Sequence, residues 1–207
     1  MFTTSFRDTV LGTLGGFIGL IKTITDFRAG TVTEAAYTGY GTRPAITYGA
    51  AANTSPLGGR QKANSALVTF PQNTGSNETE IGWGVWSAST AGTLQAIGFL
   101  DTTPPMFGVG QVDDFIHSIA HGLVTDQRVF VLATPGAILP TGLAENTAYF
   151  VLAVGLTADL FKVSLTSGGA AIDITVGGAV LFMSYKAVTV ATNATPEFAI
   201  GALLVQM

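Results

Sequence analysis

The chain has 207 residues, enough for one large domain or two small ones. Only 11% of the residues are charged, against roughly 25% in an ordinary soluble protein, whereas the hydrophobic fraction of 47% is close to normal. The net charge of −4 and the lack of a Lys/Arg cluster argue against nucleic-acid binding. The absence of cysteine excludes disulfide frameworks, thiolate metal sites and cysteine nucleophiles.

The low number of charged side chains also bears on assembly. With 9 basic and 13 acidic side chains, a compact monomer would be poorly covered by charge. Such a surface is expected where much of it faces other protein. We therefore expect a subunit of an assembly, with a closed homotrimer favoured because it would cover exposed sheet edges.

The longest apolar stretch, residues 10–21, is interrupted by four glycines and is shorter than the roughly 20 residues that a membrane helix needs. We expect no membrane insertion. A signal peptide is not expected either, because Arg7 is offset by Asp8 and no small-residue cleavage site follows.

The N-terminus carries the one helical pattern. Phe6, Val10, Leu11 and Leu14 follow helical spacing, and the glycines at 15 and 16 predict the helix end. So short a helix is unstable alone and must dock on something. It either clamps a neighbouring subunit, with Phe2 and Phe6 as contact residues, or docks on its own domain.

The next part of the chain predicts strands bounded by turn residues. They are residues 17–25, 43–48, 66–71, 80–87 and 94–100. In the fourth strand, period-two alternation places Trp83 in the core and Trp86 on the opposite face. Trp86 is either a lateral contact residue or part of a covered outer face. Strands at this spacing predict a β-sandwich.

A Pro- and Gly-containing segment, residues 102–110, is predicted to be a linker. Beyond it, five closely spaced strands are predicted over residues 128–133, 147–154, 160–165, 171–175 and 180–185. We expect an all-β chain in which residues 111–186 form a small β-module. The module is inserted into a β-sandwich of residues 1–110 and 187–207, which includes the N-terminal arm.

Two resemblances support this division. Residues 37–50 (YTGYGTRPAITYGA), 64–71 (NSALVTFP), 80–86 (EIGWGVW) and 187–203 together resemble small bacteriophage virion proteins of the tail-fibre-like type. Residues 114–129, 139–151 and 161–175 are similar to a β-module that recurs in phage tail and surface proteins. The sequence departs from that module at residues 125–127, where a glycine is usual in the turn.

The resemblance implies a structural protein of the virion, made in the host cytoplasm, with no enzymatic activity and no cofactor. We expect a capsid decoration (cement) protein that binds the major capsid protein or other virion proteins. The alternative is a tail-fibre or tail-tip component that contributes to receptor binding, with a host surface glycan as a possible partner.

The sequence offers two chemical alternatives. Asp113, Asp114, His117 and His121 would suit a zinc site if the two histidines shared a helix face, but Gly122 and the module's His-Gly-Leu turn favour a turn-stabilising histidine at 121. Paired carboxylates could hydrolyse polysaccharide. The candidates for that pair are scattered over predicted loops, which argues against the idea: Asp101, Asp113, Asp114, Glu145 and Asp173.

Overall fold

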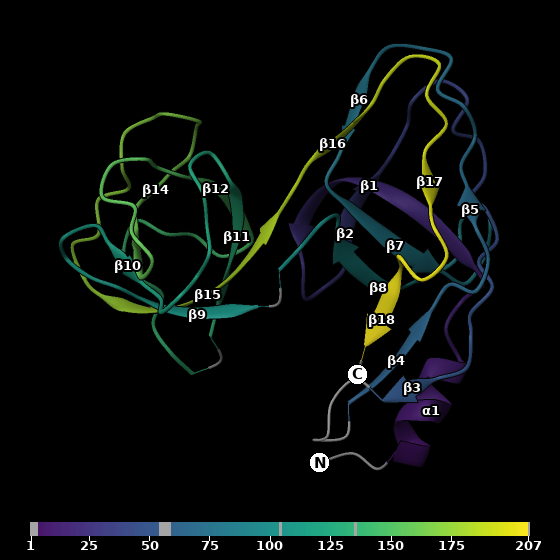
Figure 1. Cartoon of the computed structure of the whole chain (residues 1–207), viewed down its shortest axis with the longest axis horizontal. Coiled ribbons are helices and arrows are strands. Elements are labelled where there is room, and N and C mark those ends of the chain that lie inside the picture. The colour runs from purple at the N-terminus through teal and green to yellow at the C-terminus, as the bar shows by residue number, and fades with distance from the viewer. Residues whose placement is uncertain (1–3, 54–58, 104, 135, 207) are drawn as a thin grey trace. The chain divides into compact units, whose positions relative to one another are not determined.

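The computed structural model describes residues 4–53, 59–103, 105–134 and 136–206 (Figure 1). Apart from one short helix, α1, the described elements are strands, which confirms the all-β fold class. The chain divides into two compact units. Unit 1 contains the described residues up to Ile24, Arg28–Gly98 and those from Ala187 onward, and unit 2 contains Thr25–Phe27 and Phe99–Lys186.

Unit 1 is built from α1 and several small sheets. Its elements are α1 (Thr4–Gly12), β1 (Phe17–Asp26), β2 (Thr31–Glu34), β3 (Ala52–Asn53), β4 (Arg60–Ala63), β5 (Val68–Thr69), β6 (Glu78–Glu80), β7 (Gly82–Trp86), β8 (Leu94–Phe99), β16 (Val188–Val190), β17 (Glu197–Phe198) and β18 (Leu204–Gln206). The last residues of β1 and of β8 already belong to unit 2.

The largest sheet of unit 1 has the order β2-β1-β7-β8. β1 runs antiparallel to β7, with Ile18 opposite Val85 and Gly19 opposite Gly84. Ile18, Ile21 and Val85 are fully buried because this sheet is covered on both faces. Trp83 is also buried, as its alternation predicted.

Two buried asparagines attach the C-terminal segment to the rest of unit 1. The Asn64 amide donates to Ala199 O at 2.8 Å and accepts from Leu203 N at 3.0 Å. The Asn73 amide donates to Val190 O at 2.9 Å. Side-chain amides can satisfy both donors and acceptors of irregular backbone, so they replace a continuous strand ladder here.

Helix α1 docks on its own unit. Asp8 receives two hydrogen bonds from the Arg60 guanidinium of β4, at 2.8 and 3.0 Å, and Leu11 is buried. The described part of the N-terminal arm therefore packs on its own unit, and a contact of Phe2 and Phe6 with a neighbouring subunit stays a prediction.

Unit 2 is a small closed barrel. Its strands are β9 (Met106–Gly110), β10 (Ile116–His117), β11 (Arg128–Ala133), β12 (Thr147–Val151), β13 (Leu160–Phe161), β14 (Val163–Ser164) and β15 (Gly178–Tyr185). The sheet order is β13-β10-β9-β15-β11-β12-β14, and only Lys162 separates the two edge strands β13 and β14 in the chain. One segment therefore forms both edges, and the strands curve around a common centre in Figure 1. Among the described strands of unit 2, this closure leaves neither β13 nor β14 as an open end of the sheet.

The barrel interior is filled by apolar side chains, and their burial stabilises it. Aromatic rings contribute through edge contacts, such as Phe161 against Phe182 at 5.1 Å between centroids. The buried cluster is made of Ile116, Leu123, Val129, Val131, Leu143, Tyr149, Val151, Phe161, Val163, Ile174, Val180 and Phe182.

Three sequence predictions differ from the structure. Residues 106–110 of the expected linker form β9, and Gly108 is needed there because a Cβ would lie 2.7 Å from Ile116 Cγ2. Residues 43–48 make only isolated bridges, at Ala45 and Tyr48, since Pro44 lacks a donor. Residues 171–175 are not a strand because side chains take over the pairing, as where Ile174 N donates to Asp114 Oδ1 at 2.9 Å.

Candidate functional site

The three predicted contact residues have different outcomes. Phe2 lies outside the described residues, and Phe6 is described only as a backbone position in α1. Trp86 is 5% exposed, and the Arg43 guanidinium lies 4.3 Å above its ring. The structure thus has Trp86 in a covered outer face, which leaves little of the ring for a partner.

The Trp86 ring packs against two glycines. Gly19 of β1 and Gly84 of β7 are paired across the sheet. A Cβ on Gly19 would lie 2.8 Å from Trp86 Cζ3, and one on Gly84 would lie 2.6 Å from Trp86 Cη2. Both positions must therefore lack a side chain for the indole to lie flat on the strands.

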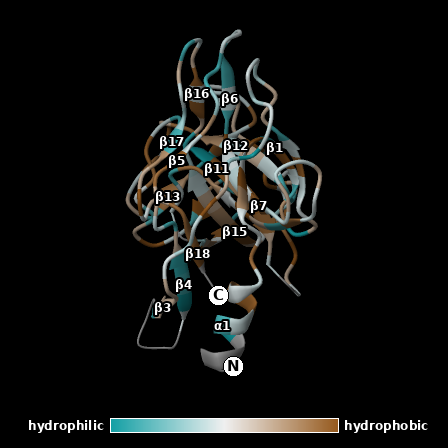
Figure 2. Cartoon of the chain, turned by 90° about the vertical axis from the view of Figure 1, so that its right-hand side faces the viewer, coloured by the Kyte–Doolittle hydropathy of each residue, from teal (hydrophilic) through white to brown (hydrophobic). Residues whose placement is uncertain are grey.

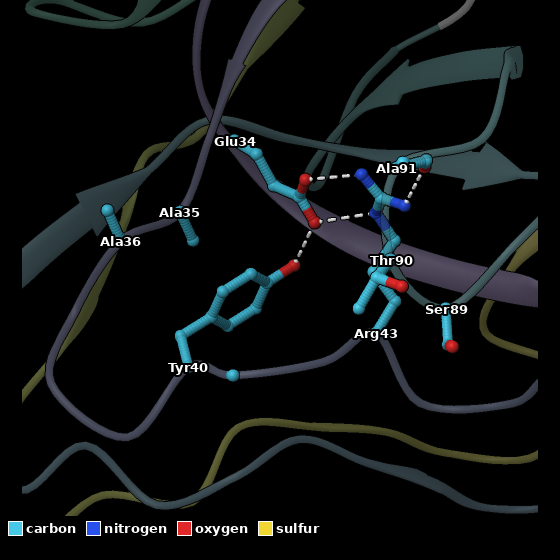
Figure 3. A pocket seen from close by; sticks show the side chains of 9 residues that line it. Glu34, Ala35, Ala36, Tyr40, Arg43, Ser89, Thr90 and Ala91 are labelled. Carbon is cyan, nitrogen blue, oxygen red and sulfur yellow. Dashed lines mark hydrogen bonds and ion pairs between the residues drawn. The ribbon is translucent and has the colours of Figure 1, made fainter.

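Above the indole, three polar side chains form a hydrogen-bonded cluster at the edge of a pocket of about 370 Å³ (Figure 3). Arg43 makes a bidentate pair with Glu34, with Nε to Oε1 at 2.8 Å and Nη2 to Oε2 at 2.7 Å. The Tyr40 hydroxyl donates to Glu34 Oε1 at 2.6 Å. The remaining guanidinium nitrogen donates to Ala88 O at 2.9 Å and to Ala91 O.

The electrostatics of this cluster favour a structural role. Burial, together with the hydrogen bond to Glu34 and the charge of Glu34, raises the pKa of Tyr40 well above its usual value. Tyr40 also accepts a hydrogen bond from Leu20 N at 3.1 Å, so its hydroxyl is used as donor and acceptor. Every guanidinium nitrogen of Arg43 is bonded to the protein. The cluster therefore ties two loops to β2 and offers no free nucleophile or general base.

The residues of the alternative zinc site do not come together. His117 is exposed on β10, and His121 is 4% exposed in a turn. His121 Nδ1 accepts a hydrogen bond from Leu123 N at 3.0 Å, and its ring lies against Phe161. This is the turn-stabilising role that the sequence favoured. Within the described ranges, no group of three or more His, Cys, Asp or Glu side chains could hold a metal ion.

Three of the candidate acids accept backbone hydrogen bonds within unit 2, and the first is Asp113, which accepts from Phe115 N at 3.2 Å. Asp114 accepts from Ile174 N, and its other oxygen lies 3.6 Å from Lys162 Nζ. Glu145 accepts from Ala133 N at 3.3 Å. Each of these carboxylates thus holds a loop of unit 2 in place.

The barrel does expose one apolar face that sequence analysis missed. Phe107, Val109 and Ile119 are 67%, 47% and 90% exposed, and they line a shallow groove of about 390 Å³ together with His117. His117 lies opposite Val109 in the register, so these side chains share the outer face of β9 and β10. The alternation of residues 106–110 is the signal that could have revealed this face, had the segment been assigned as a strand.

The comparison with known families points to phage fibres. Residues 15–112 match the family model described as Gp80, podophage GP4 fiber I protein gp80. The chain is similar to a phage fibre protein. This match supports a structural role in the virion. It begins just before β1 and extends beyond β9, so it covers most of unit 1 and leaves most of the barrel outside.

No curated protein and no solved structure matches the chain. Of the helices that the structure describes, none has the length and hydropathy to cross a membrane.

Proposed function

We propose that this protein is a non-enzymatic subunit of a phage fibre that contributes to attachment to the host. The family match over residues 15–112 carries the proposal, because the matched family is a fibre family. The capsid-decoration hypothesis has less support, since that match favours the tail-fibre alternative. A low number of charged side chains and a closed barrel suit a structural subunit that acts by binding other molecules.

The apolar face of β9 and β10 is the surface we assign to attachment. Exposed aromatic and aliphatic side chains next to one imidazole can bury apolar area against a receptor. The barrel also carries more acidic than basic side chains, so a neutral receptor fits it better than an anionic one. A host surface glycan without charged groups has this chemistry, and a trimer would multiply each weak contact.

Competition for adsorption tests this proposal. Purified full-length protein, incubated with host cells before infection, should reduce phage adsorption. Phe107→Ser and Ile119→Ser should weaken this competition by about tenfold, since each removes buried apolar area from the contact. Leu165→Ser is the matched control, because Leu165 is 58% exposed and lies outside this face.

The outcomes separate the alternatives. Protein that binds purified phage heads but not host cells would overturn the attachment role in favour of capsid decoration. Release of sugars from host polysaccharide during the incubation would contradict the non-enzymatic assignment.

A further inference from the structure

Unit 1 contains a carboxyl group buried without a partner. Glu80, the last residue of β6, is 0% exposed. Among the described residues, neither of its carboxyl oxygens has a hydrogen-bond partner. A carboxylate in this position would lose its hydration without compensation, whereas a neutral acid costs much less to bury.

The position of Glu80 links it to the start of the C-terminal segment. β6 pairs only with β16 in its sheet, and Glu80 lies opposite Val188. The two strands run side by side in Figures 1 and 2, and the hydropathy colouring of Figure 2 shows β6 as hydrophilic and β16 as hydrophobic. This two-stranded pair is short, so its stability depends strongly on single side chains.

Few charged or titratable groups face Glu80. Glu78 lies on the same strand, and its charge disfavours ionisation of Glu80. Lys22 of β1 acts in the opposite direction but lies 3.8 Å from Glu78 and is 48% exposed. Tyr37, in the loop after β2, is close enough for the charge of Glu80 to affect its pKa, but its hydroxyl donates to Pro71 O at 3.0 Å. β16 contributes no titratable side chain.

These surroundings keep the proton on Glu80 at neutral pH. Burial and the charge of Glu78 raise the pKa of Glu80 to about 8, and Lys22 lowers it only in part. If the pair opens, Glu80 enters water and returns to its ordinary pKa near 4.5. Opening is therefore coupled to loss of a proton.

We propose that Glu80 is a proton-controlled latch, in which the neutral acid keeps β6 paired with β16 and rising pH frees the beginning of the C-terminal segment. Opening is confined to that beginning because the Asn73 amide still holds Val190 O. The pairing of β6 with β16, where the chain returns from the barrel to unit 1, therefore has a pH-dependent stability. This property is separate from the proposed role in attachment.

Amide hydrogen exchange followed by NMR between pH 5.5 and 7.5 tests the latch on the full-length protein. After correction for intrinsic exchange, the opening constant of the amides that pair β6 with β16 should rise about tenfold per pH unit, and Glu80→Gln should abolish this rise. Glu197→Gln is the control, because Glu197 lies on an exposed part of β17 and should leave the rise intact.

A second measurement does not depend on the variants. The carboxyl carbon shift of Glu80, followed with pH in the unaltered protein, should titrate well above 4.5. A midpoint near 4.5, or an opening constant that stays flat in the unaltered protein, would overturn the proposal.

Discussion

Gly19 shows why one position in the largest sheet of unit 1 must lack a side chain. Its Cα hydrogen faces the Trp86 ring, the Tyr40 hydroxyl and Glu34, which together leave no room for a methyl group. Gly19→Ala should therefore destabilise unit 1 by roughly 1–3 kcal/mol through overpacking. Chemical denaturation monitored by tryptophan fluorescence measures this, because both tryptophans lie in β7.

Gly16→Ala is the control for that prediction. A Cβ at Gly16 would meet nothing within 4 Å. Equal midpoints for the two variants would show that the indole does not lie against Gly19.

Arg43 is the second residue whose substitution should have a specific effect on stability. Its side chain is 10% exposed and forms a bidentate pair with Glu34 and bonds to two carbonyls. Arg43→Lys should destabilise the protein by about 2 kcal/mol, since an ammonium cannot reproduce the planar fork. Arg60→Lys should cost less, because its partner Asp8 is 40% exposed. If thermal unfolding ranks the two variants in the opposite order, the Arg43 cluster is not the stronger one.

At the scale of elements, the C-terminal segment depends on the buried amide of Asn73. This amide donates to Ser76 O and Val190 O, and it accepts from Gly75 N, all at 2.9 Å. Asn73→Asp removes both donors and should cost about 3 kcal/mol, because the carbonyls of Ser76 and Val190 lose their partners and the one at Val190 is buried.

Asn77→Asp provides a matched control, since Asn77 uses only its oxygen as an acceptor for Thr192. Limited proteolysis should then cut the C-terminal segment faster in the Asn73 variant than in the Asn77 variant. Equal cleavage rates would show that Asn73 does not hold this segment.

The elements also show what the sequence could predict. β11 was predicted with its observed bounds, because Arg128–Ala133 is a run of β-branched and aromatic residues between turn signals. β9 was missed since its glycines suggested a linker, although they are required for close packing inside the barrel. Barrel closure through Lys162 could not be predicted, because it depends on which distant strands pair.

The candidate site was less predictable than the strands. The alternation of residues 80–87 placed the two tryptophans correctly on opposite faces, but nothing local revealed that Arg43 covers Trp86. Glu80 was also missed. Its signal is an acidic residue two positions before a fully buried strand, and the lack of a partner for its carboxyl group arises only from tertiary packing.

At the scale of the whole molecule, the pH dependence of stability follows from Glu80. Its pKa is about 8 when folded and near 4.5 when unfolded, so the folded state binds more protons between these values. Stability should therefore fall as pH rises from about 5 to 8, by at most about 1.4 kcal/mol per pH unit. Denaturation midpoints at pH 6 and pH 8 measure this fall, and a protein as stable at pH 8 as at pH 6 would contradict it.

Unit 2 should fold alone, because its sheet closes on itself and its core is complete. A fragment of residues 99–186 is expected to give a dispersed amide spectrum. This fragment lacks Phe27, whose ring stacks on Phe99 with 5.6 Å between the centroids. Its melting temperature should therefore be lower than that of a second fragment in which residues 25–27 are joined to residues 99–186 by a linker. A collapsed spectrum for both fragments would show that the barrel depends on unit 1.

The location of the protein in the virion tests the central claim most directly. Immunogold electron microscopy of intact virions, with an antibody against residues 113–186, should place label on the fibres at the tail. Label spread over the head would contradict the fibre assignment and favour capsid decoration, and virions without label would contradict a structural role in the particle.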